Sequence, residues 1–416
     1  MSEVRTGKIL VINCGSSSLK YEIFEMPAKK SLGKGLVERI GSDNGHLIQK
    51  FEDKKVDLTE PIQDHKYALK LVMRSIADKE NGLIGDLNEI TGVGHRVVHG
   101  GEKYASSVEI TDDVIKAIEE NINLAPLHNP PNLTGINAAK DVLPDLRQVA
   151  VFDTAFHQTM PPSAYLYGIP RELYDKYKIR RYGFHGTSHR YVASRSISLM
   201  KRFPENTNVI SCHLGNGASI TAIENGKSVD TSMGFTPLEG VVMGTRSGDI
   251  DPSIIFYLLE QGYTKDELNT MLNKKSGLLG LSGISNDLRD VEKAAAEGNK
   301  KAIETLDLYA YRIRKYIGAY VANMVKVDLL VFTGGIGENA FVMRERICHR
   351  LENLGIYMDY EKNAANGSKE GVISHNYSPT TIMVVPTNEE LQIAVDTYQI
   401  ISGEYSIAPE KTEVNI

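Results

Sequence analysis

The sequence predicts an α/β fold built from two related domains. Short β-branched and apolar segments, typical of buried strands, occur at residues 8–13, 148–152, 208–213 and 327–333. Helical segments separate them, which is the order of elements in α/β proteins. Residues 8–24 and 208–223 also share one pattern, a strand, a turn of glycine and small polar residues, and a second strand. This repeat favours a duplicated domain over the alternative that two unrelated hairpins look alike.

Two helices can be placed from their residue patterns. Residues 300–325 carry one apolar stripe at spacings of three and four residues, formed by Leu306, Ala310, Ile313, Ile317 and Val321. A second helix is expected to follow Thr111 as its N-cap, with Asp112 and Asp113 in the first turn, where the helix dipole favours acidic side chains. We expect Pro126 to end this helix.

The composition is that of a globular protein with a hydrophobic core, since 41% of the 416 residues are hydrophobic and 24% are charged. The net charge of −6 is spread without basic blocks, which argues against nucleic acid or an anionic membrane as main partner. No stretch has the length of a transmembrane helix or the pattern of a signal peptide. Cys14, Cys212 and Cys348 lack disulfide or zinc spacing, so we expect core cysteines in a reducing cytoplasm.

Three glycine-rich turns are candidates for binding phosphate. They lie at residues 13–18, 213–219 and 334–339, each directly after a predicted strand. Glycine lets backbone N–H groups approach an anion closely, and hydroxyl side chains add donors. None of the three has the spacing of a Walker A loop or of a dinucleotide-binding GxGxxG loop. A single such turn is more often structural, but three together favour a nucleoside triphosphate bound between two lobes.

Four further segments are polar where a core would be apolar, and they contain Arg96, His128, Asp153 and Arg246. Each residue has a plain alternative role, such as a surface ion pair, a loop contact or a helix cap. Asp249 and Asp251 are expected to cap a helix that begins at Pro252. Together, however, the four supply what phosphoryl transfer needs, because its transition state is stabilised by positioned cationic and hydrogen-bonding groups.

The segment RRYGFHGTSHRYVA, residues 180–193, raises a choice between a metal site, a nucleophile and a packed turn. Zinc could use His185 and His189 on a helix, but Gly183 and Gly186 argue against an uninterrupted helix and a third ligand is missing nearby. Ser188 lacks the GxSxG pattern of a nucleophile elbow. A turn that stabilises a phosphoryl group is the interpretation that fits best.

Nine segments occur in a distinctive order: INCGSSSLKY, GHRVVHGG, LAPLHNPPN, VFDTAFH, YGFHGTSH, HLGNGAS, MGTRSGDIDP, VFTGGIGEN and PTNEEL. Over residues 8–401 they resemble the acetate kinases. The resemblance implies a duplicated actin-like/sugar-kinase (RNase H-like) ATPase fold with two lobes and a central cleft. It also implies a homodimer that converts acetate and ATP into acetyl phosphate and ADP, with Mg²⁺, or Mn²⁺ in its place, as the metal.

The same resemblance implies roles for individual residues. Metal binding would fall to Asn13 and Glu389, and catalysis to Asp153, His185 and Arg246. Acid binding would involve Arg96 and His128, with a small apolar pocket for the methyl group made by Val98, Leu127, Phe184 and Pro237. Nucleotide binding would involve Lys20, His213, Leu214, Gly215, Asn216, Gly217, Asp287, Leu288, Arg289, Gly334, Gly335, Ile336, Gly337 and Glu338. His189 would be a neighbour that shapes the turn.

Domain limits and the role of Asp153 follow from these assignments. The first domain would comprise residues 1–153 and 386–416, because Glu389 and Asn13 would share one metal, and the second residues 154–385. A carboxylic acid with a pKa of about 4–5 is ionised at neutral pH, so the reaction needs no general base. We therefore expect Asp153 to orient Arg246 or the magnesium shell.

Three alternatives remain at this point. The first is a kinase for propionate or another short acid, since one methylene is worth only about 1–3 kcal/mol of discrimination. The second is a kinase that acts on a hydroxyl group, which an arginine for a carboxylate would not serve. The third is an ATP-gated binding module on the same fold.

Overall fold

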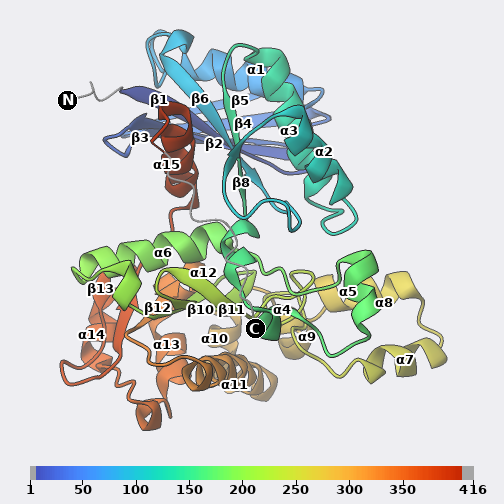
Figure 1. Cartoon of the computed structure of the whole chain (residues 1–416), viewed down its shortest axis with the longest axis vertical. Helices are drawn as coiled ribbons and strands as arrows, with labels where there is room; N and C mark the ends of the chain where they lie inside the picture. The colour runs from blue at the N-terminus through green and yellow to red at the C-terminus, as the bar shows by residue number, and fades with distance from the viewer. Residues whose placement is uncertain (1–5, 405–416) are drawn as a thin grey trace. The chain divides into compact units, whose positions relative to one another are not determined.

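The computed structural model describes residues 6–404. The chain forms two compact units (Figure 1). The first unit comprises Met1–Phe156 and Asn388–Ile416, and the second comprises His157–Thr387. In the described part of the chain, no helix is both long enough and apolar enough to cross a membrane.

The first unit is built on an eight-stranded sheet with the order β5-β4-β3-β2-β1-β6-β8-β7. The strands are β1 Gly7–Cys14, β2 Ser18–Met26, β3 Lys30–Glu38, β4 Ser42–Phe51, β5 Lys54–Ile62, β6 Ile90–Val97, β7 Val108–Glu109 and β8 Gln148–Phe152. The helices are α1 His65–Ile76, η1 Leu87–Glu89, α2 Asp112–Glu120, α3 Asn129–Val142 and α15 Glu389–Ser402. Because α15 belongs to the first unit, the chain returns to that unit after the second unit is complete.

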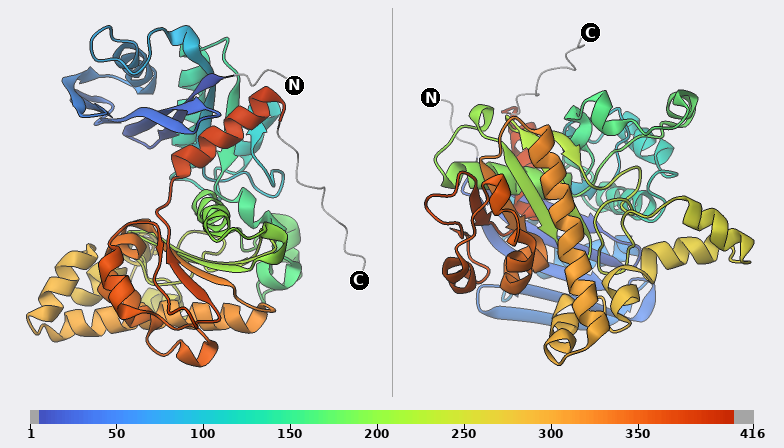
Figure 2. Two further views of the ribbon diagram at one scale, coloured as in Figure 1. Left: turned by 90° about the vertical axis from the view of Figure 1, so that its left-hand side faces the viewer. Right: turned by 90° about the horizontal axis from the view of Figure 1, so that it is seen from below.

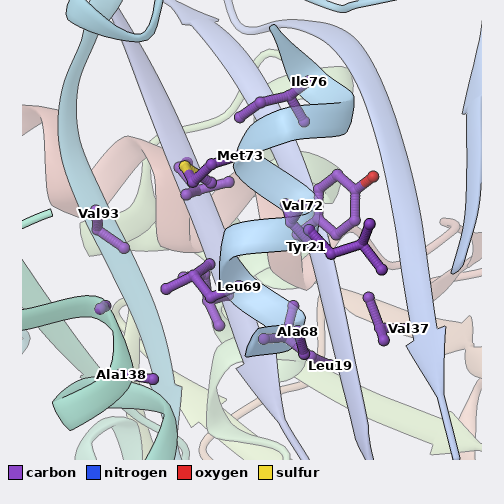
Figure 3. Packing of buried hydrophobic residues seen from close by; sticks show 14 of the residues in the cluster. Leu19, Tyr21, Val37, Ala68, Leu69, Val72, Met73, Ile76, Val93 and Ala138 are labelled. Carbon is purple, nitrogen blue, oxygen red and sulfur yellow. The ribbon is translucent and has the colours of Figure 1, made fainter. Parts of the chain in front are cut away.

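The core of the first unit lies on both faces of this sheet. Figure 3 shows α1 against one face, with Leu69, Val72 and Met73 pointing at the strands. These side chains recur at helical spacing, so one stripe of α1 is buried, and Asp64 caps its start by accepting from the Tyr67 N–H at 2.7 Å. On the opposite face α15 packs on β1, β2, β6 and β8 (Figure 2). Its buried contacts there include Ile393.

The second unit contains a six-stranded sheet with the order β11-β10-β9-β12-β14-β13. Its strands are β9 Val209–Leu214, β10 Ala218–Glu224, β11 Lys227–Thr231, β12 Leu329–Thr333, β13 Gly371–Val372 and β14 Thr381–Val384. Before and between them lie η2 Ala155–Thr159, α4 Pro162–Tyr165, α5 Arg171–Tyr177, α6 Gly186–Leu199, η3 Pro204–Asn206, α7 Ser253–Glu260, α8 Lys265–Lys274, α9 Gly277–Ser282 and α10 Leu288–Ala296. The remaining helices are α11 Lys300–Asn323, α12 Gly334–Asn339, α13 Phe341–Cys348, η4 Glu352–Leu354 and α14 Tyr360–Asn366.

The two sheets share one topology. In the first, β1 pairs antiparallel with β2 and parallel with β6. In the second, β9 pairs antiparallel with β10 and parallel with β12. The orders β3-β2-β1-β6-β8 and β11-β10-β9-β12-β14 therefore correspond strand by strand. This confirms the predicted α/β class and the duplication, as well as all four predicted strands.

Local predictions had mixed outcomes. α11 is confirmed, with the predicted stripe buried up to Ile317 and Val321 half-buried. α2 follows Thr111 as predicted, but Pro126 does not end it, because the helix stops at Glu120. There Asn121 donates from its side chain to the carbonyl of Ala117 at 2.7 Å, which competes with a further helical turn.

Two other predictions were partly wrong. A helix does run through His189, since α6 begins at Gly186. Glycine costs little at this first position, where the N–H lies outside the intrahelical ladder. Of the two predicted caps, Asp251 accepts from the Ser253 N–H at 2.9 Å, whereas Asp249 accepts from the Gly240 N–H and the Tyr316 hydroxyl instead.

The three cysteines are buried and unpaired, as predicted.

Candidate active site

In the second unit, two glycine-rich loops lie side by side at the ends of neighbouring strands. Gly215–Gly217 joins β9 to β10, and β12 leads directly into α12. Gly334 has a φ of +75°, and a Cβ atom there would lie 2.7 Å from the carbonyl oxygen of Leu214. Glycine is therefore required for this close approach. A Cβ atom on Gly215 would lie 3.9 Å from the Gly335 nitrogen, so the two predicted phosphate loops meet.

These loops border a pocket of about 470 Å³, within the usual size range of small-molecule sites. Its lining is contributed by three chain segments, through Gly215, Asn216, Asn286, Asp287, Leu288, Arg289, Glu292, Gly335, Ile336, Asn339 and Ala340. The structure thus brings together both glycine-rich loops and the segment Asp287–Arg289, all of which the resemblance assigns to the nucleotide. Arg289 pairs with Asp287 at 2.5 Å, and this hydrogen bond lowers the pKa of the Asp287 carboxyl to about 2.

Other predicted nucleotide residues belong to the same loops without lining this pocket: His213, Leu214, Gly217, Gly334, Gly337 and Glu338. The carboxylate of Glu338 is used inside the loop. It accepts from the N–H of Gly334 at 2.9 Å and from the N–H of Thr387 at 3.1 Å. Glu338 therefore fixes the turn through its side chain.

His185 is held by a network of buried hydroxyl groups. It occupies the N-cap position of α6 in the left-handed region, with φ +56°. Its Nδ1 hydrogen-bonds with the Ser219 hydroxyl at 2.9 Å, and the same hydroxyl hydrogen-bonds with His189 Nε2 at 2.7 Å. A Cβ atom on Gly217 would lie 3.3 Å from His185 Nε2, so that edge of the ring faces the β9–β10 loop. Burial holds the pKa of His189 well below its usual value, so His189 is neutral.

Arg246 lies beside the same glycine. Its guanidinium would be 3.6 Å from a Cβ atom on Gly217. Among the described residues it makes no ion pair, and its one hydrogen bond is a long contact of 3.7 Å to the sulfur of Met243. Burial lowers the pKa of Arg246. An arginine side chain nevertheless stays protonated in proteins, so Arg246 carries its positive charge. A half-buried, unneutralised guanidinium next to His185 and a glycine loop is suited to bind an anion.

In the first unit, Arg96 lies between two carboxylates. It is on β6, and its guanidinium pairs with Asp153, which is buried directly after β8. Its Nε is 3.9 Å from the carboxylate of Glu389, the first residue of α15. Burial by itself would lower the pKa of Arg96, but the charges of Asp153 and Glu389 outweigh it and the pKa is raised. The predicted role of Asp153 in orienting Arg246 or magnesium stays a prediction.

The Nε of Arg96 is itself a candidate ligand contact. It is buried and has no hydrogen-bond partner among the described residues. A buried donor without a partner costs about 1–3 kcal/mol. An acceptor on a bound anion would remove this cost, and a carboxylate matches the planar fork of a guanidinium.

The residues expected to hold magnesium offer hard oxygen donors. Asn13 is the cross-strand partner of Lys20, and both line a pocket with Glu390, the residue after Glu389. Burial raises the pKa of Glu389 to about 7, with Asp153 and Glu390 adding to the rise and Arg96 and Lys20 opposing it. A divalent cation would stabilise this excess of negative charge, so the donor set fits Mg²⁺. No cluster of three His, Cys, Asp or Glu side chains suited to a metal occurs within residues 6–404.

The predicted apolar pocket residues divide between the units. Val98 and Leu127 belong to the first unit, and Phe184 and Pro237 to the second. Val98 and Phe184 are buried, Pro237 is half-buried, and Leu127 is 71% exposed. His128 is the N-cap residue of α3 and is half-buried.

Sequence reasoning missed the groups that support this site. Asn132 accepts from the Val98 N–H at 3.1 Å and donates to the Cys14 carbonyl at 3.1 Å, while Asn129 accepts from the His99 N–H at 3.2 Å. These buried asparagines tie α3 to the Arg96 segment and to the first hairpin. The signal was present as the two asparagines that flank the Pro–Pro pair in LHNPPN. Glu292 was also missed, although its buried Oε1 has no hydrogen-bond partner among the described residues and it borders the pocket.

The duplicated sheets, the paired glycine loops and the two arginines together define a nucleotide-dependent kinase of the actin-like class. Residues 8–395 match the Acetokinase family. An acetate kinase of Clostridium botulinum is 56% identical over 394 residues, covering 94% of this chain and 99% of the relative. The crystal structure of Porphyromonas gingivalis acetate kinase superposes with a TM-score of 0.92 at 49% identity, covering 95% of this chain and all of that chain.

A propionate kinase from Francisella tularensis is also similar, with a TM-score of 0.88, 44% identity and coverage of 95% of this chain and 100% of that one. The chain belongs to the acetokinase family. The actin-like fold implied by the sequence resemblance is thereby confirmed. The family assignment excludes the two alternatives outside it, a kinase that acts on a hydroxyl group and an ATP-gated binding module.

Proposed function

We propose that this protein transfers the γ-phosphoryl group of ATP reversibly to acetate, giving acetyl phosphate and ADP. The observation that carries the proposal is the pair of incompletely satisfied arginines. Arg96 has a buried Nε donor without a hydrogen-bond partner, and Arg246 is half-buried with no ion-pair partner among the described residues. One is suited to a carboxylate and the other to a phosphoryl group. The relatives named acetate kinase support the choice of acid.

In the proposed reaction, Arg96 holds the acetate carboxylate, and Asp153 acts on the guanidinium by fixing its orientation. Acetate is already an anion at neutral pH, so its oxygen attacks the γ-phosphorus without losing a proton. The bond to the bridging oxygen breaks and ADP leaves with the negative charge. His185 and Arg246 donate to the equatorial oxygens, where charge spreads in the transition state. Magnesium, held through Asn13 and Glu389, would neutralise charge on the phosphates.

The proposed division of labour follows the two units. The acid-binding groups Arg96 and Val98 belong to the first domain, residues 1–153 with 386–416. The nucleotide groups other than Lys20 belong to the second domain, residues 154–385, which also contributes Phe184 and Pro237 to the proposed acid pocket. The pocket of about 470 Å³ between the glycine loops and Asp287–Arg289 supports the second part of this proposal.

Propionate is the second candidate acid, because one similar crystal structure is described as a propionate kinase. Val98 is the residue that would limit the length of the acid. An assay with acetate, propionate and butyrate that traps the acyl phosphate as hydroxamate separates the candidates. Arg96→Ala should raise the KM for acetate far more than the KM for ATP. Arg96→Lys should raise the KM for acetate less than Arg96→Ala does, because lysine keeps the positive charge but lacks the planar pair of donors that an arginine offers. An unchanged KM for acetate would refute the role of Arg96.

We also propose a homodimer in the cytoplasm. α7 carries Ile254, Phe256, Tyr257 and Leu259, all more than 40% exposed, and none of its residues is buried. Figure 2 shows α7 and α8 projecting from the rest of the second unit. A second copy would cover this apolar surface. Light scattering should give the mass of two chains, and Phe256→Ser should shift the measured mass toward that of one chain. The proposed location in the cytoplasm is supported by the three unpaired cysteines, which suit a reducing compartment.

A further inference from the structure

The buried hydroxyl of Ser188 joins two distant segments of the second unit. Ser188 lies in the first turn of α6 and is completely buried. Its Oγ is 2.8 Å from Nδ1 of His213, near the end of β9, and 2.7 Å from the hydroxyl of Thr387. A completely buried oxygen is not available to attack a substrate, so the structure excludes Ser188 as a nucleophile and leaves its two hydrogen bonds to be explained.

These two hydrogen bonds have one direction in which every hydroxyl proton finds an acceptor. Each hydroxyl carries one proton, and Nδ1 of a neutral imidazole either accepts or donates. If Thr387 donates to Ser188 and Ser188 donates to His213 Nδ1, both protons are used. In the reverse direction the Thr387 proton lacks an acceptor, because Ser188 is the one partner of that hydroxyl within residues 6–404. Thr387 is half-buried and a buried donor without an acceptor is costly, which favours the first direction.

Both ends of this chain of hydrogen bonds are fixed by neighbouring groups. The N–H of Thr387 donates to Glu338 Oε1 at 3.1 Å, and the same oxygen accepts from the N–H of Gly334 at 2.9 Å. At the other end, the ring of His213 stacks on the ring of His185, with centroids 4.3 Å apart and planes inclined by 30°. The orientation of His213 is therefore well defined.

The other ring nitrogen of His213 is directed at a glycine-rich loop. A Cβ atom on Gly215 would lie 4.0 Å from His213 Nε2, so this edge of the ring faces the β9–β10 loop. When Nδ1 accepts a hydrogen bond, the one proton of a neutral imidazole is on Nε2. An N–H group at this place is suited to donate to a phosphate oxygen, whereas a bare nitrogen would repel that oxygen.

We propose that Ser188 is a positioning residue that keeps the proton of a neutral His213 on Nε2, so that His213 donates a hydrogen bond to a phosphate oxygen of the bound nucleotide. Ser188 acts through His213, and Thr387 sets the direction of the hydrogen bonds. The inference rests on the proposed function for the identity of the ligand. A donor that is fixed before the ligand arrives needs no reorganisation when it binds. Without Ser188, the ring would populate both tautomers and the donor would be present for only part of the time.

The proton can be located by NMR of the protein labelled with ¹⁵N-histidine, without nucleotide. Long-range ¹H–¹⁵N correlation spectra distinguish a protonated ring nitrogen from a bare one, and the signals of His213 are those missing from His213→Gln. We expect a bare Nδ1 and a protonated Nε2 in the unaltered protein, and a mixture of the two tautomers in Ser188→Ala. The measurement on the unaltered protein tests the proposal even if Ser188→Ala does not fold.

Calorimetry tests the consequence for binding. ADP with Mg²⁺ should bind about three- to tenfold more weakly to Ser188→Ala, which is the range expected for one hydrogen bond. Adenosine has no phosphate and should bind equally to Ser188→Ala and to the unaltered protein. Ser196→Ala is the matched control, since Ser196 is an equally buried serine of α6 whose hydroxyl donates to the Ala193 carbonyl at 2.9 Å. It should keep the tautomer of His213 and both affinities.

A protonated Nδ1 in the unaltered protein, or an unchanged tautomer in Ser188→Ala, would overturn the proposal. It would also be overturned if Ser188→Ala kept its affinity for ADP, if it lost affinity for adenosine equally, or if Ser196→Ala lost as much affinity for ADP. If the tautomer and ADP binding behave as expected but no acyl phosphate forms from acetate, this inference is supported and the proposed function is refuted.

Discussion

Ser219 offers a sharp test of how the proposed phosphoryl-binding group is held. Its hydroxyl is completely buried on β10 and hydrogen-bonds with both His185 Nδ1 and His189 Nε2, at 2.9 and 2.7 Å. Ser219→Ala removes both bonds and leaves room for the ring of His185 to turn. Complete loss of one hydrogen-bond donor to a transition state typically costs about 2.7–4 kcal/mol, which is a factor of about 10²–10³ in kcat. Because the variant disorders His185 without removing it, we expect a fall in kcat of about tenfold, with little change in either KM.

The control for this prediction is Thr221→Val. Thr221 is equally buried two residues further along β10, and its hydroxyl hydrogen-bonds with Thr231 at 2.8 Å, away from the proposed site. Both variants lose a buried hydroxyl and should lower the free energy of unfolding by about 1–3 kcal/mol, measured by urea denaturation. Thr221→Val should keep its kcat. If both variants lost stability and both kept kcat within twofold, the orientation of His185 would not depend on Ser219, and the reasoning would fail.

Three further predictions rest on other contacts. Arg246→Met should lower kcat by about 10²–10³ in steady-state assays while ATP binding by calorimetry changes little, and loss of ATP affinity alone would contradict a role in the transition state. Asn132→Ala should destabilise the first unit by about 2–3 kcal/mol in urea unfolding, because it leaves the Val98 N–H and the Cys14 carbonyl without their partner. Burial lowers the pKa of His157 from 6.5 to about 4, so the unfolded chain binds more protons between these values and stability should fall as the pH drops from 6.5 to 4. The His157 contribution is at most about 3 kcal/mol, and the unfolding free energy of His157→Gln should depend less on pH across this window.

The parts of the fold that the sequence predicted are those set by local patterns. The four buried strands and α11 depend on apolar periodicity, and the paired hairpins depend on glycine turns between strands. The helix at His189 was missed because glycine propensity was applied to Gly186 as if it lay in a helix interior. The early end of α2 depends on one side-chain contact, from Asn121 to Ala117, which periodicity cannot reveal.

The candidate site shows the same division. Glycine loops and charged residues that contact ligands have recognisable sequence patterns, whereas the residues that hold them do not. Ser219 lies on β10 among apolar positions, and its role depends on histidines thirty or more residues earlier in the chain. Asn132 joins segments that are 118 residues apart. Such contacts depend on tertiary structure, and only the fold brings their partners together.

The electrostatics of the two arginines explain why they can serve different ligands. Burial raises the pKa of Glu389, Asp153 and Glu390 raise it further, and Arg96 and Lys20 lower it. Three carboxylates therefore lie near two cations around Arg96. This leaves an excess negative charge, so an acetate ion would be repelled unless a proton or a divalent cation compensates it. Because burial raises the pKa of Glu389 to about 7, this carboxyl group would carry such a proton in part near neutral pH. Arg246 has no carboxylate partner in the described chain, so its charge would be available to the proposed phosphoryl group. The proposed acid site would therefore bind acetate together with a proton or a cation.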